Sequence, residues 1–283
     1  MTAGDLVIDR LTGADVDAAH DLSDRAGWDT RPRDWRRLVD LDAVDAFAGR
    51  IDGALAATAT LVRYGSRVSW IGMMLVRPAS RRQGCGTRML RACLDAAAEA
   101  NVDVVGLDAN DGGKPLYDAH GFVAVADVIQ WRGAVAGATR PKRVTTLSSP
   151  DPVAAFDRRA SGVDRRFLLA SLLDDDRTAG LLRRGPDGSV AGYALVRRRS
   201  SGWTVGPLVA ARPDDAGALV RAASTRTDGG PFVLNAVDAP GAMNWSRRLG
   251  FDRQRSLTRM TYRHRAEPLV HERIRAITAF EYG

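Results

Sequence analysis

Alternating apolar and polar positions in the first third of the chain predict strands that are separated by tight turns. The runs 44–51, 54–64 and 68–76 are rich in Val, Ala, Thr and Leu, and Asp52-Gly53 and Gly65-Ser66 separate them. A short glycine-containing pair between two such runs is typical of a β-hairpin. The pattern therefore predicts an antiparallel meander.

Helical periodicity surrounds this meander. Residues 14–40 carry apolar side chains at three- and four-residue spacing, which predicts two helices broken near Gly27 and Pro32. The alanine- and leucine-rich run 87–100 predicts a further helix. The other elements expected here are a strand over 102–107, a short helix over 115–119 and a strand over 123–131. Together these elements indicate an α/β (α+β) fold.

The second half of the chain repeats landmarks of the first half. The recurring pairs are Asp52-Gly53 with Asp187-Gly188, Leu75-Val76 with Leu208-Val209, and Gly121-Phe122 with Gly250-Phe251. The stretch 133–152 is rich in Gly, Pro, Ser and Thr, as linkers are. We therefore expect two domains, 1–140 and 141–283, and a last helix or strand over 274–280 closing the chain.

The composition is that of a soluble globular protein, since 45% of the 283 residues are hydrophobic and 27% are charged. Cys85 and Cys93 are the two cysteines, and neither they nor the four histidines have a metal-ligand spacing, so we expect no metal. The chain has no run of about 18 apolar residues and no cationic segment leading into an apolar one. These features predict a cytoplasmic protein without a membrane partner.

The net charge of +7 is carried almost entirely by arginine. Arginine binds phosphates and carboxylates with paired hydrogen bonds, so a polyanionic cofactor, an acidic substrate or nucleic acid would each fit, as would solvated surface charge. Basic and aromatic residues do not alternate in repeats, which disfavours nucleic acid. The cationic run Arg31, Arg33, Arg36 and Arg37 is interpreted as a solvated helix face, with contact to a cofactor phosphate or an acidic substrate as the alternative.

The segment 76–87 carries the clearest candidate chemistry, because it joins an expected strand to an expected helix. Gly84 and Gly86 remove Cβ atoms where a backbone approaches a ligand, and the following helix start offers unpaired N–H groups. Arg81 and Arg82 add positive charge at the same place. The loop is therefore a candidate phosphate or pyrophosphate site.

This segment resembles the acetyl-CoA signature V-x-P-x-x-R-x-x-G-x-G of the GNAT superfamily of N-acetyltransferases. Its signature positions hold Val76, Pro78, Arg81, Gly84 and Gly86. A second family motif, N-x-x-A/G-x-x-L-Y-x-x-x-G-F, is matched downstream by Asn110, Gly113, Leu116, Tyr117, Gly121 and Phe122. The resemblance covers residues 6–132. Together with the repeated landmarks of the second half, it implies two GNAT-like domains in tandem, each a mixed, mostly antiparallel sheet flanked by helices.

The resemblance also implies roles for individual residues. The cofactor would be held by Met74, Leu75, Val76, Arg81, Arg82, Gln83, Gly84, Cys85, Gly86, Thr87, Asn110 and Tyr117. A backbone N–H of Met74, Leu75 or Val76 would meet the acetyl carbonyl oxygen, and Tyr117 would protonate the leaving thiolate. Asp108 is the candidate general base, with a water relay as the alternative. Trp28 and Trp70 are candidate substrate contacts, with core packing as the competing interpretation.

The second half resembles a degenerate copy of the same domain. Its counterpart of the glycine loop, residues 209–217, lacks the R-x-x-G-x-G pattern and carries Asp214 and Asp215 where phosphates would lie. Ser246 stands at the position that matches Tyr117. We therefore expect cofactor binding in the first half only.

The sequence thus predicts an acetyl-CoA-dependent N-acetyltransferase that acts by direct attack of a primary amine, without a covalent enzyme intermediate. Acetyl-CoA is the expected co-substrate and a small-molecule amine the expected partner, with no nucleic acid, no membrane and a monomeric or homodimeric chain. The alternative is a non-catalytic acyl-CoA sensor or interaction module. Both hypotheses need the cofactor loop, and only the first needs Tyr117.

Overall fold

A computed structural model describes residues 6–135, 141–238, 249–263 and 273–283. The elements of the first half are β1 (Val7–Arg10), α1 (Val16–Arg25), α2 (Pro32–Asp40), β2 (Val44–Ile51), β3 (Ala54–Tyr64), β4 (Val68–Val76), α3 (Cys85–Glu99), β5 (Val104–Ala109), α4 (Lys114–Asp118) and β6 (Phe122–Gly133). Those of the second half are β7 (Val144–Leu147), α5 (Asp151–Ser161), α6 (Arg166–Leu173), β8 (Thr178–Arg184), β9 (Val190–Arg198), β10 (Trp203–Ala210), α7 (Pro213–Ser224), β11 (Phe232–Val237), β12 (Asp252–Tyr262) and β13 (Ile274–Ala276).

The expected meander is confirmed, because β2, β3 and β4 have the expected bounds and pair antiparallel in that order. In β3 nearly every side chain from Ala56 onward is buried, which is typical of a strand covered on both faces. The helix after Gly27 begins where a capping box forms: the backbone N–H of Arg31 donates to the Asp34 carboxylate at 3.0 Å, and Pro32 occupies the first turn.

Several boundaries differ from the sequence expectation. The helix α3 begins two residues earlier than expected, at Cys85, and β5 lies two residues further along the chain, at Val104–Ala109. The stretch 133–152 is not linker throughout, since Val144–Leu147 forms β7 and pairs antiparallel with β8. Glycine and proline around this strand marked turns, whereas the partner that makes it a strand lies more than thirty residues further on.

The two halves are repeats that share one sheet. In the described residues the strand order is β1-β2-β3-β4-β5-β12-β6-β11-β10-β9-β8-β7, and β13 pairs with β10. The order reads the same from both ends when β7 to β12 are matched with β1 to β6. Most pairs are antiparallel, and β4 with β5 and β10 with β11 are the parallel ones.

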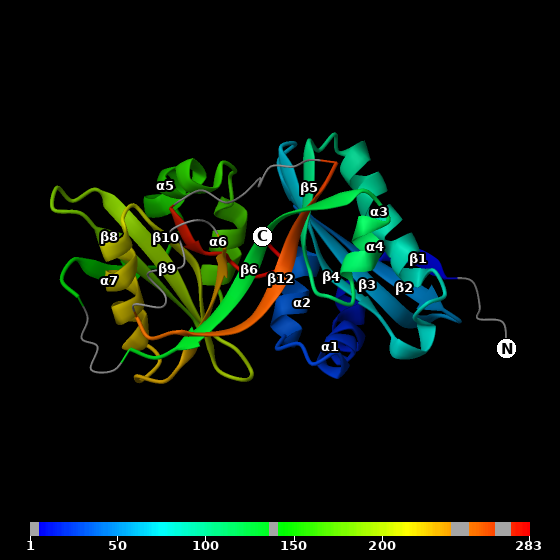
Figure 1. The fold of residues 1–283 in the computed structure, drawn as a ribbon, viewed down its shortest axis with the longest axis horizontal. Helices are drawn as coiled ribbons and strands as arrows, with labels where there is room; N and C mark the ends of the chain where they lie inside the picture. The colour runs from blue at the N-terminus through cyan, green and yellow to red at the C-terminus, as the bar shows by residue number, and fades with distance from the viewer. Residues whose placement is uncertain (1–5, 136–140, 239–248, 264–272) are drawn as a thin grey trace.

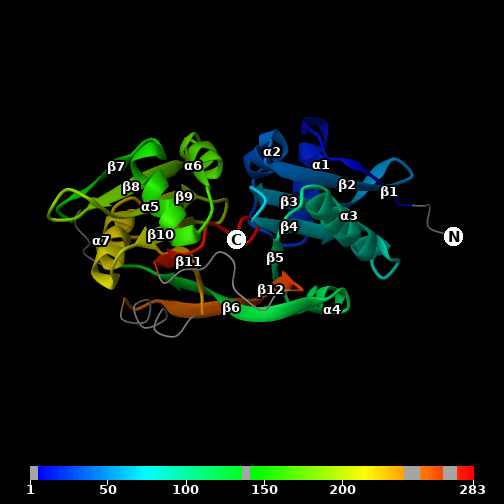
Figure 2. The same cartoon turned by 90° about the horizontal axis from the view of Figure 1, so that it is seen from above.

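The centre of this order shows an exchange of strands between the halves. The strand β12 of the second half pairs with β5 of the first, and β6 of the first half pairs with β11 of the second. In Figures 1 and 2 β6 and β12 run side by side from one half to the other. The division at residue 140 stays a prediction, and two strands cross between the units that it would define.

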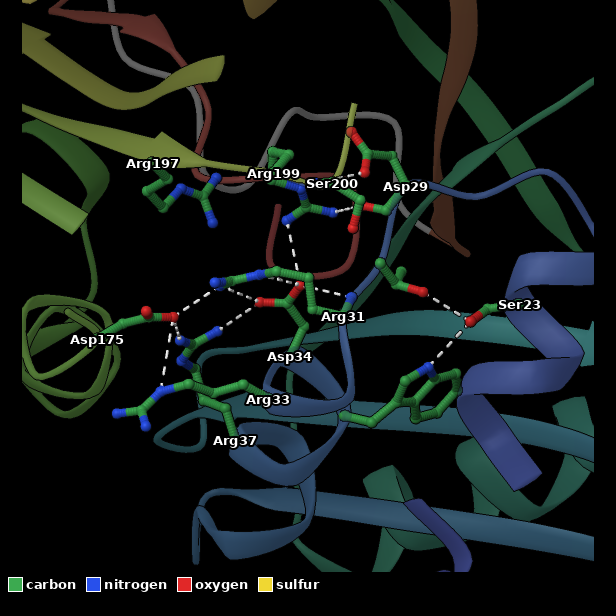
Figure 3. A network of polar contacts seen from close by, with 12 residues as sticks. Ser23, Asp29, Arg31, Arg33, Asp34, Arg37, Asp175, Arg197, Arg199 and Ser200 are labelled. Atoms are coloured by element: carbon green, nitrogen blue, oxygen red, sulfur yellow. Dashed lines mark hydrogen bonds and ion pairs between the residues drawn. The ribbon is translucent and has the colours of Figure 1, made fainter. Parts of the chain in front are cut away.

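A shared core and a buried charge network hold the halves together. One hydrophobic cluster contains Trp35 and Trp70 of the first half together with Leu168 and Tyr193 of the second. Beside it, the Asp175 carboxylate accepts hydrogen bonds from Arg31 at 2.6 Å and from Arg37 at 2.8 Å, as Figure 3 shows. The expectation of a solvated arginine face is therefore wrong for Arg31 and Arg37, because carboxylates of both halves bind them.

The network keeps its acids ionised. Burial alone would raise the pKa of Asp175, but hydrogen bonds from the Arg31 side chain and the Arg177 backbone amide outweigh it and hold that pKa well below its usual range. The pKa of Asp34 is also lowered, since burial is outweighed by the charge of Arg199 and the hydrogen bond from Arg31. The contact between the halves therefore depends on charged carboxylates. No helix in the described part of the chain is long and apolar enough to cross a bilayer.

Candidate functional site

The loop between β4 and α3 has the geometry of an anion site. Gly84 caps the helix with φ +79°, in the left-handed region that favours glycine, and a Cβ at this position would meet nothing within 4 Å. The first amide of the helix that donates to a backbone carbonyl is that of Arg88, to Gly84 at 3.0 Å. In the described structure the amides from Arg82 to Thr87 therefore have no backbone acceptor, and Arg82, Gln83 and Gly84 are exposed.

The side chains around this loop divide into exposed and packed ones. Arg81, Arg82 and Gln83 are exposed, and the Nε of Arg81 donates to the Val76 carbonyl at 3.0 Å. Gly86 has a different role from Gly84, because a Cβ there would lie 3.3 Å from Leu116 of α4. The loop thus places its cations at the surface, while Gly86 lets α3 and α4 approach closely.

Next to the loop, β4 and β5 separate. Their parallel pairing ends at Ile71 with Leu107, and no described strand pairs with β4 beyond that point on this side. A β-bulge follows at once, where Met73 and Met74 oppose one residue of β3. Met73 has φ +48°, and its carbonyl accepts from the Thr58 hydroxyl at 2.8 Å. The bulge therefore distorts β4 at the point where the strand has left β5, shortly before the loop.

The second motif closes the other side of the site. The side chain of Asn110 is exposed, and its Oδ1 accepts from the Gly113 amide at 2.8 Å, which shapes the turn before α4. Tyr117 is 7% exposed on α4, with its ring 5.8 Å from that of Phe122. Burial, with a smaller effect of Cys93, raises the pKa of Tyr117, so the phenol stays protonated at neutral pH. A protonated phenol is what a general acid requires.

Asp108 lies where β5 ends, but it is not a free carboxylate. Arg259 of β12 donates to its two oxygens, from Nε at 2.8 Å and from a terminal nitrogen at 2.9 Å, and both side chains are completely buried. The guanidinium also lies 4.5 Å from the centre of the Trp70 ring. Protonation of Asp108 would remove the negative charge that pairs with Arg259 and weaken the two hydrogen bonds, which weighs against a role as general base. The base assignment stays a prediction.

The two tryptophans named as candidate substrate contacts lie in different surroundings. Trp70 is fully buried, and its Nε1 donates to the Phe280 carbonyl at 2.9 Å. A substrate contact by Trp70 would require Arg259 or the C-terminal segment to move. Trp28 is half-buried in the connection between α1 and α2. The neighbouring Asp29 accepts hydrogen bonds from the Ser200 and Ser201 amides of the second half, at 3.0 and 3.2 Å.

The second half has the same bulge with different chemistry. Gly206 and Pro207 of β10 oppose one residue of β9, so Pro207 stands where β4 has Met74. Proline has no backbone N–H to donate. The split between β10 and β11 is filled: β13 pairs with Leu208 and Val209, and the Ile277 amide donates to the Asn235 carbonyl at 2.8 Å. Asp215 is buried and pairs with Arg183, and Ser246 lies outside the described residues.

Sequence reasoning did not identify Arg259 or the segment after β13 as parts of this site. Both come from the second half: Arg259 reaches the first on the exchanged strand β12, and the segment after β13 continues onto β4, so no local motif marks either of them. Across the described ranges, no group of three His, Cys, Asp or Glu side chains is placed to hold a metal ion.

Comparison with known proteins relates both halves of the chain to GNAT acetyltransferases. Residues 16–122 match the model of the Acetyltransferase (GNAT) family, and residues 153–275 match that of an Acetyltransferase (GNAT) domain. The holothin acyltransferase of Pseudoalteromonas sp. (strain SANK 73390) is 26% identical over 263 residues, which cover 90% of this chain and 87% of the relative.

Two solved structures share the fold over nearly the whole chain. A Pyrococcus horikoshii protein assigned as an acetyltransferase aligns with a TM-score of 0.85 at 21% identity, covering 98% of this chain and 96% of that one. A tandem GNAT protein from the clavulanic acid biosynthesis pathway aligns with a TM-score of 0.62 at 14% identity, covering 91% and 98%. The arrangement of two such units in one chain is thus shared.

Proposed function

The chain belongs to the GNAT acetyltransferase superfamily, with two such domains in tandem, and we propose that its first half transfers an acetyl group from acetyl-CoA to the primary amine of a small molecule. The observation that carries the proposal is the row of amides at residues 82–87 without a backbone acceptor, which follows the end of β4 where that strand has left β5. The anion site would fit the pyrophosphate of the cofactor, and the split between β4 and β5 would fit its thioester end.

The transfer would proceed in one complex. The amides of residues 82–87 bind the pyrophosphate, and Arg81 and Arg82 add charge from the loop surface. A backbone N–H at the bulge, from Met74, Leu75 or Val76, stabilises the negative charge that develops on the carbonyl oxygen. The amine nitrogen attacks the carbonyl carbon, the C–S bond breaks, and Tyr117 supplies the proton to the leaving thiolate.

Only the first half would bind the cofactor. In the second half the glycine loop is absent, Pro207 cannot donate from the bulge, and β13 occupies the split. The first difference removes the anion site, the second removes the donor to the oxyanion, and the third fills the split. We therefore propose that the second half is a degenerate copy that acts through the first.

The experiment is a screen of small primary amines with acetyl-CoA, read by release of free thiol and by product mass. Because one relative is named as an acyltransferase, longer acyl-CoA donors belong in the same screen. Amine-dependent thiol release supports the enzyme. Tight acetyl-CoA binding without turnover of any amine would favour the alternative, a non-catalytic acyl-CoA sensor. Cytoplasmic location and a monomeric or homodimeric state stay predictions.

A further inference from the structure

The segment after β13 runs from the second half onto the sheet of the first, and in Figure 1 the C-terminus lies between the halves. Hydrogen bonds fix its backbone on both sides of Glu281. The Phe280 carbonyl accepts from Trp70 Nε1 at 2.9 Å, and the Tyr282 carbonyl accepts from the Tyr64 hydroxyl at 2.6 Å. Glu281 is thus held in place on β3 and β4.

Glu281 packs against the residue of β4 where the split begins. Its Cα and Cβ lie 2.8 and 3.0 Å from the position that a Cβ on Gly72 would take, so only glycine leaves room for it there. Gly72 directly follows the last pair between β4 and β5 and directly precedes the bulge. Met74 is two residues further on, at most about 7 Å at about 3.3 Å per extended residue, which a glutamate side chain and an amine together can span.

Glu281 is half-buried, and its carboxylate has no hydrogen-bond or ion-pair partner among the described residues. The carboxylates near it behave differently. Asp34, Asp157 and Asp175 each accept from at least one arginine guanidinium. Asp108, on the other side of the split, accepts from Arg259 through both oxygens. Glu281 therefore has its Cα and Cβ beside the residue that precedes the bulge, and its carboxylate oxygens are available to a ligand.

The titratable groups that interact with Glu281 keep their protons near neutral pH. Burial raises the pKa of Tyr282 on the same segment to about 12 and also raises that of Tyr64 on β3. Burial and the repulsion of Arg199 lower the pKa of Arg197 on β9 to about 10. The negative charge of Glu281 acts in the opposite direction and raises that pKa. None of these three groups changes charge between about pH 5 and 8, so none would produce a pH dependence there.

We propose that Glu281 is the general base for the acceptor, an assignment that rests on the proposed function and would replace Asp108. The amine arrives as an ammonium group, and its first proton passes to the Glu281 carboxylate and then to solvent. The neutral amine forms the C–N bond and the C–S bond breaks. The thiolate takes a proton from Tyr117, and the second proton of the amine nitrogen restores the phenol, so charges and protons balance.

The test compares Glu281→Gln with the wild type on an amine that the wild type acetylates. The matched control is Glu99→Gln, because Glu99 is exposed at the end of α3. We expect kcat/KM at pH 7 to fall by about 10²- to 10⁴-fold in Glu281→Gln and to stay unchanged in the control. The affinity for acetyl-CoA should be the same in all three proteins, since the proposed role of Glu281 is to deprotonate the acceptor amine and not to bind the cofactor.

The pH profile separates a base from a structural residue. As the pH rises, solution supplies neutral amine, so the deficit of Glu281→Gln should shrink by about tenfold per pH unit below the amine's own pKa. Glu281→Asp should lie between the two and serves as the test if the glutamine variant does not fold. A deficit that is equal at every pH, or an unchanged rate, overturns the proposal. Absence of turnover in the wild type itself overturns the proposed function instead, and it is measured first.

Discussion

Gly84→Asp should weaken acetyl-CoA binding, and Gly84→Asn is its matched control. Both side chains have the same shape, and both residue types tolerate the left-handed conformation that φ +79° imposes. A Cβ here would meet no neighbouring atom within 4 Å, so either side chain begins in open space beside the loop amides. The strain of about 1 kcal/mol is therefore common to both variants, and they differ only in charge.

The charge difference sets the size of the effect. Two unit charges 4 Å apart interact by about 1 kcal/mol in bulk water, and a pyrophosphate carries about two of them, so the repulsion is about 2 kcal/mol. This corresponds to a dissociation constant about 30-fold weaker for Gly84→Asp than for Gly84→Asn at low salt. Because Gly84 is exposed, about 0.15 M salt should reduce the ratio to a few-fold.

Calorimetric titration with acetyl-CoA at low and at physiological salt measures both ratios. Thermal melts of the two variants check that they are equally folded. Equal dissociation constants for the aspartate and asparagine variants at low salt would mean that no phosphate lies at Gly84, and the assignment of the loop would then be refuted.

Three further outcomes are expected. Tyr117→Phe should lower kcat by about 10²- to 10⁴-fold with little change in acetyl-CoA affinity, and an undiminished kcat in steady-state kinetics would remove the acid role. Calorimetry should give one acetyl-CoA per chain, and two equivalent sites would contradict the degenerate second half. Because the pKa of Asp175 is lowered in the folded chain, the stabilisation by its carboxylate is present above about pH 4 and is lost as the pH falls further. Asp175→Asn should therefore have a lower Tm than the wild type at pH 7 but lose less Tm on acidification. Equal losses of Tm in the two proteins on acidification would contradict this.

Much of the first half could be predicted from the sequence because its signals are local. The bounds of β2, β3 and β4 follow from alternation between glycine turns, and these turns need only their own residues to form. The strand exchange could not be predicted in the same way. The apolar pattern of β6 or β12 identifies a strand but is equally compatible with either neighbouring sheet, so the partner is decided by tertiary packing.

In the candidate site, too, the features set by neighbouring residues could be predicted and those set by distant residues could not. The glycine loop was predictable, because a left-handed glycine and a helix start are properties of consecutive residues. The partner of Asp108 was not, since Arg259 lies 151 residues further along the chain. The burial of Arg31 depends likewise on Asp175, which is 144 residues away. An isolated arginine run is typical of a solvated face, and only the distant carboxylate makes its burial favourable.

The exchange of strands explains why a second domain without a cofactor loop would remain part of the enzyme. The edge of β5 that faces away from β4 and the split is covered by β12, and the face of Trp70 is covered by Arg259 from that strand. The C-terminal segment leaves the filled split of the second half and continues onto β4 of the first. Removal of the second half would expose the backbone edge of β5 and leave Asp108 without its cation, and both are costly in a buried setting. The second half therefore has a structural reason to persist that is independent of any cofactor of its own.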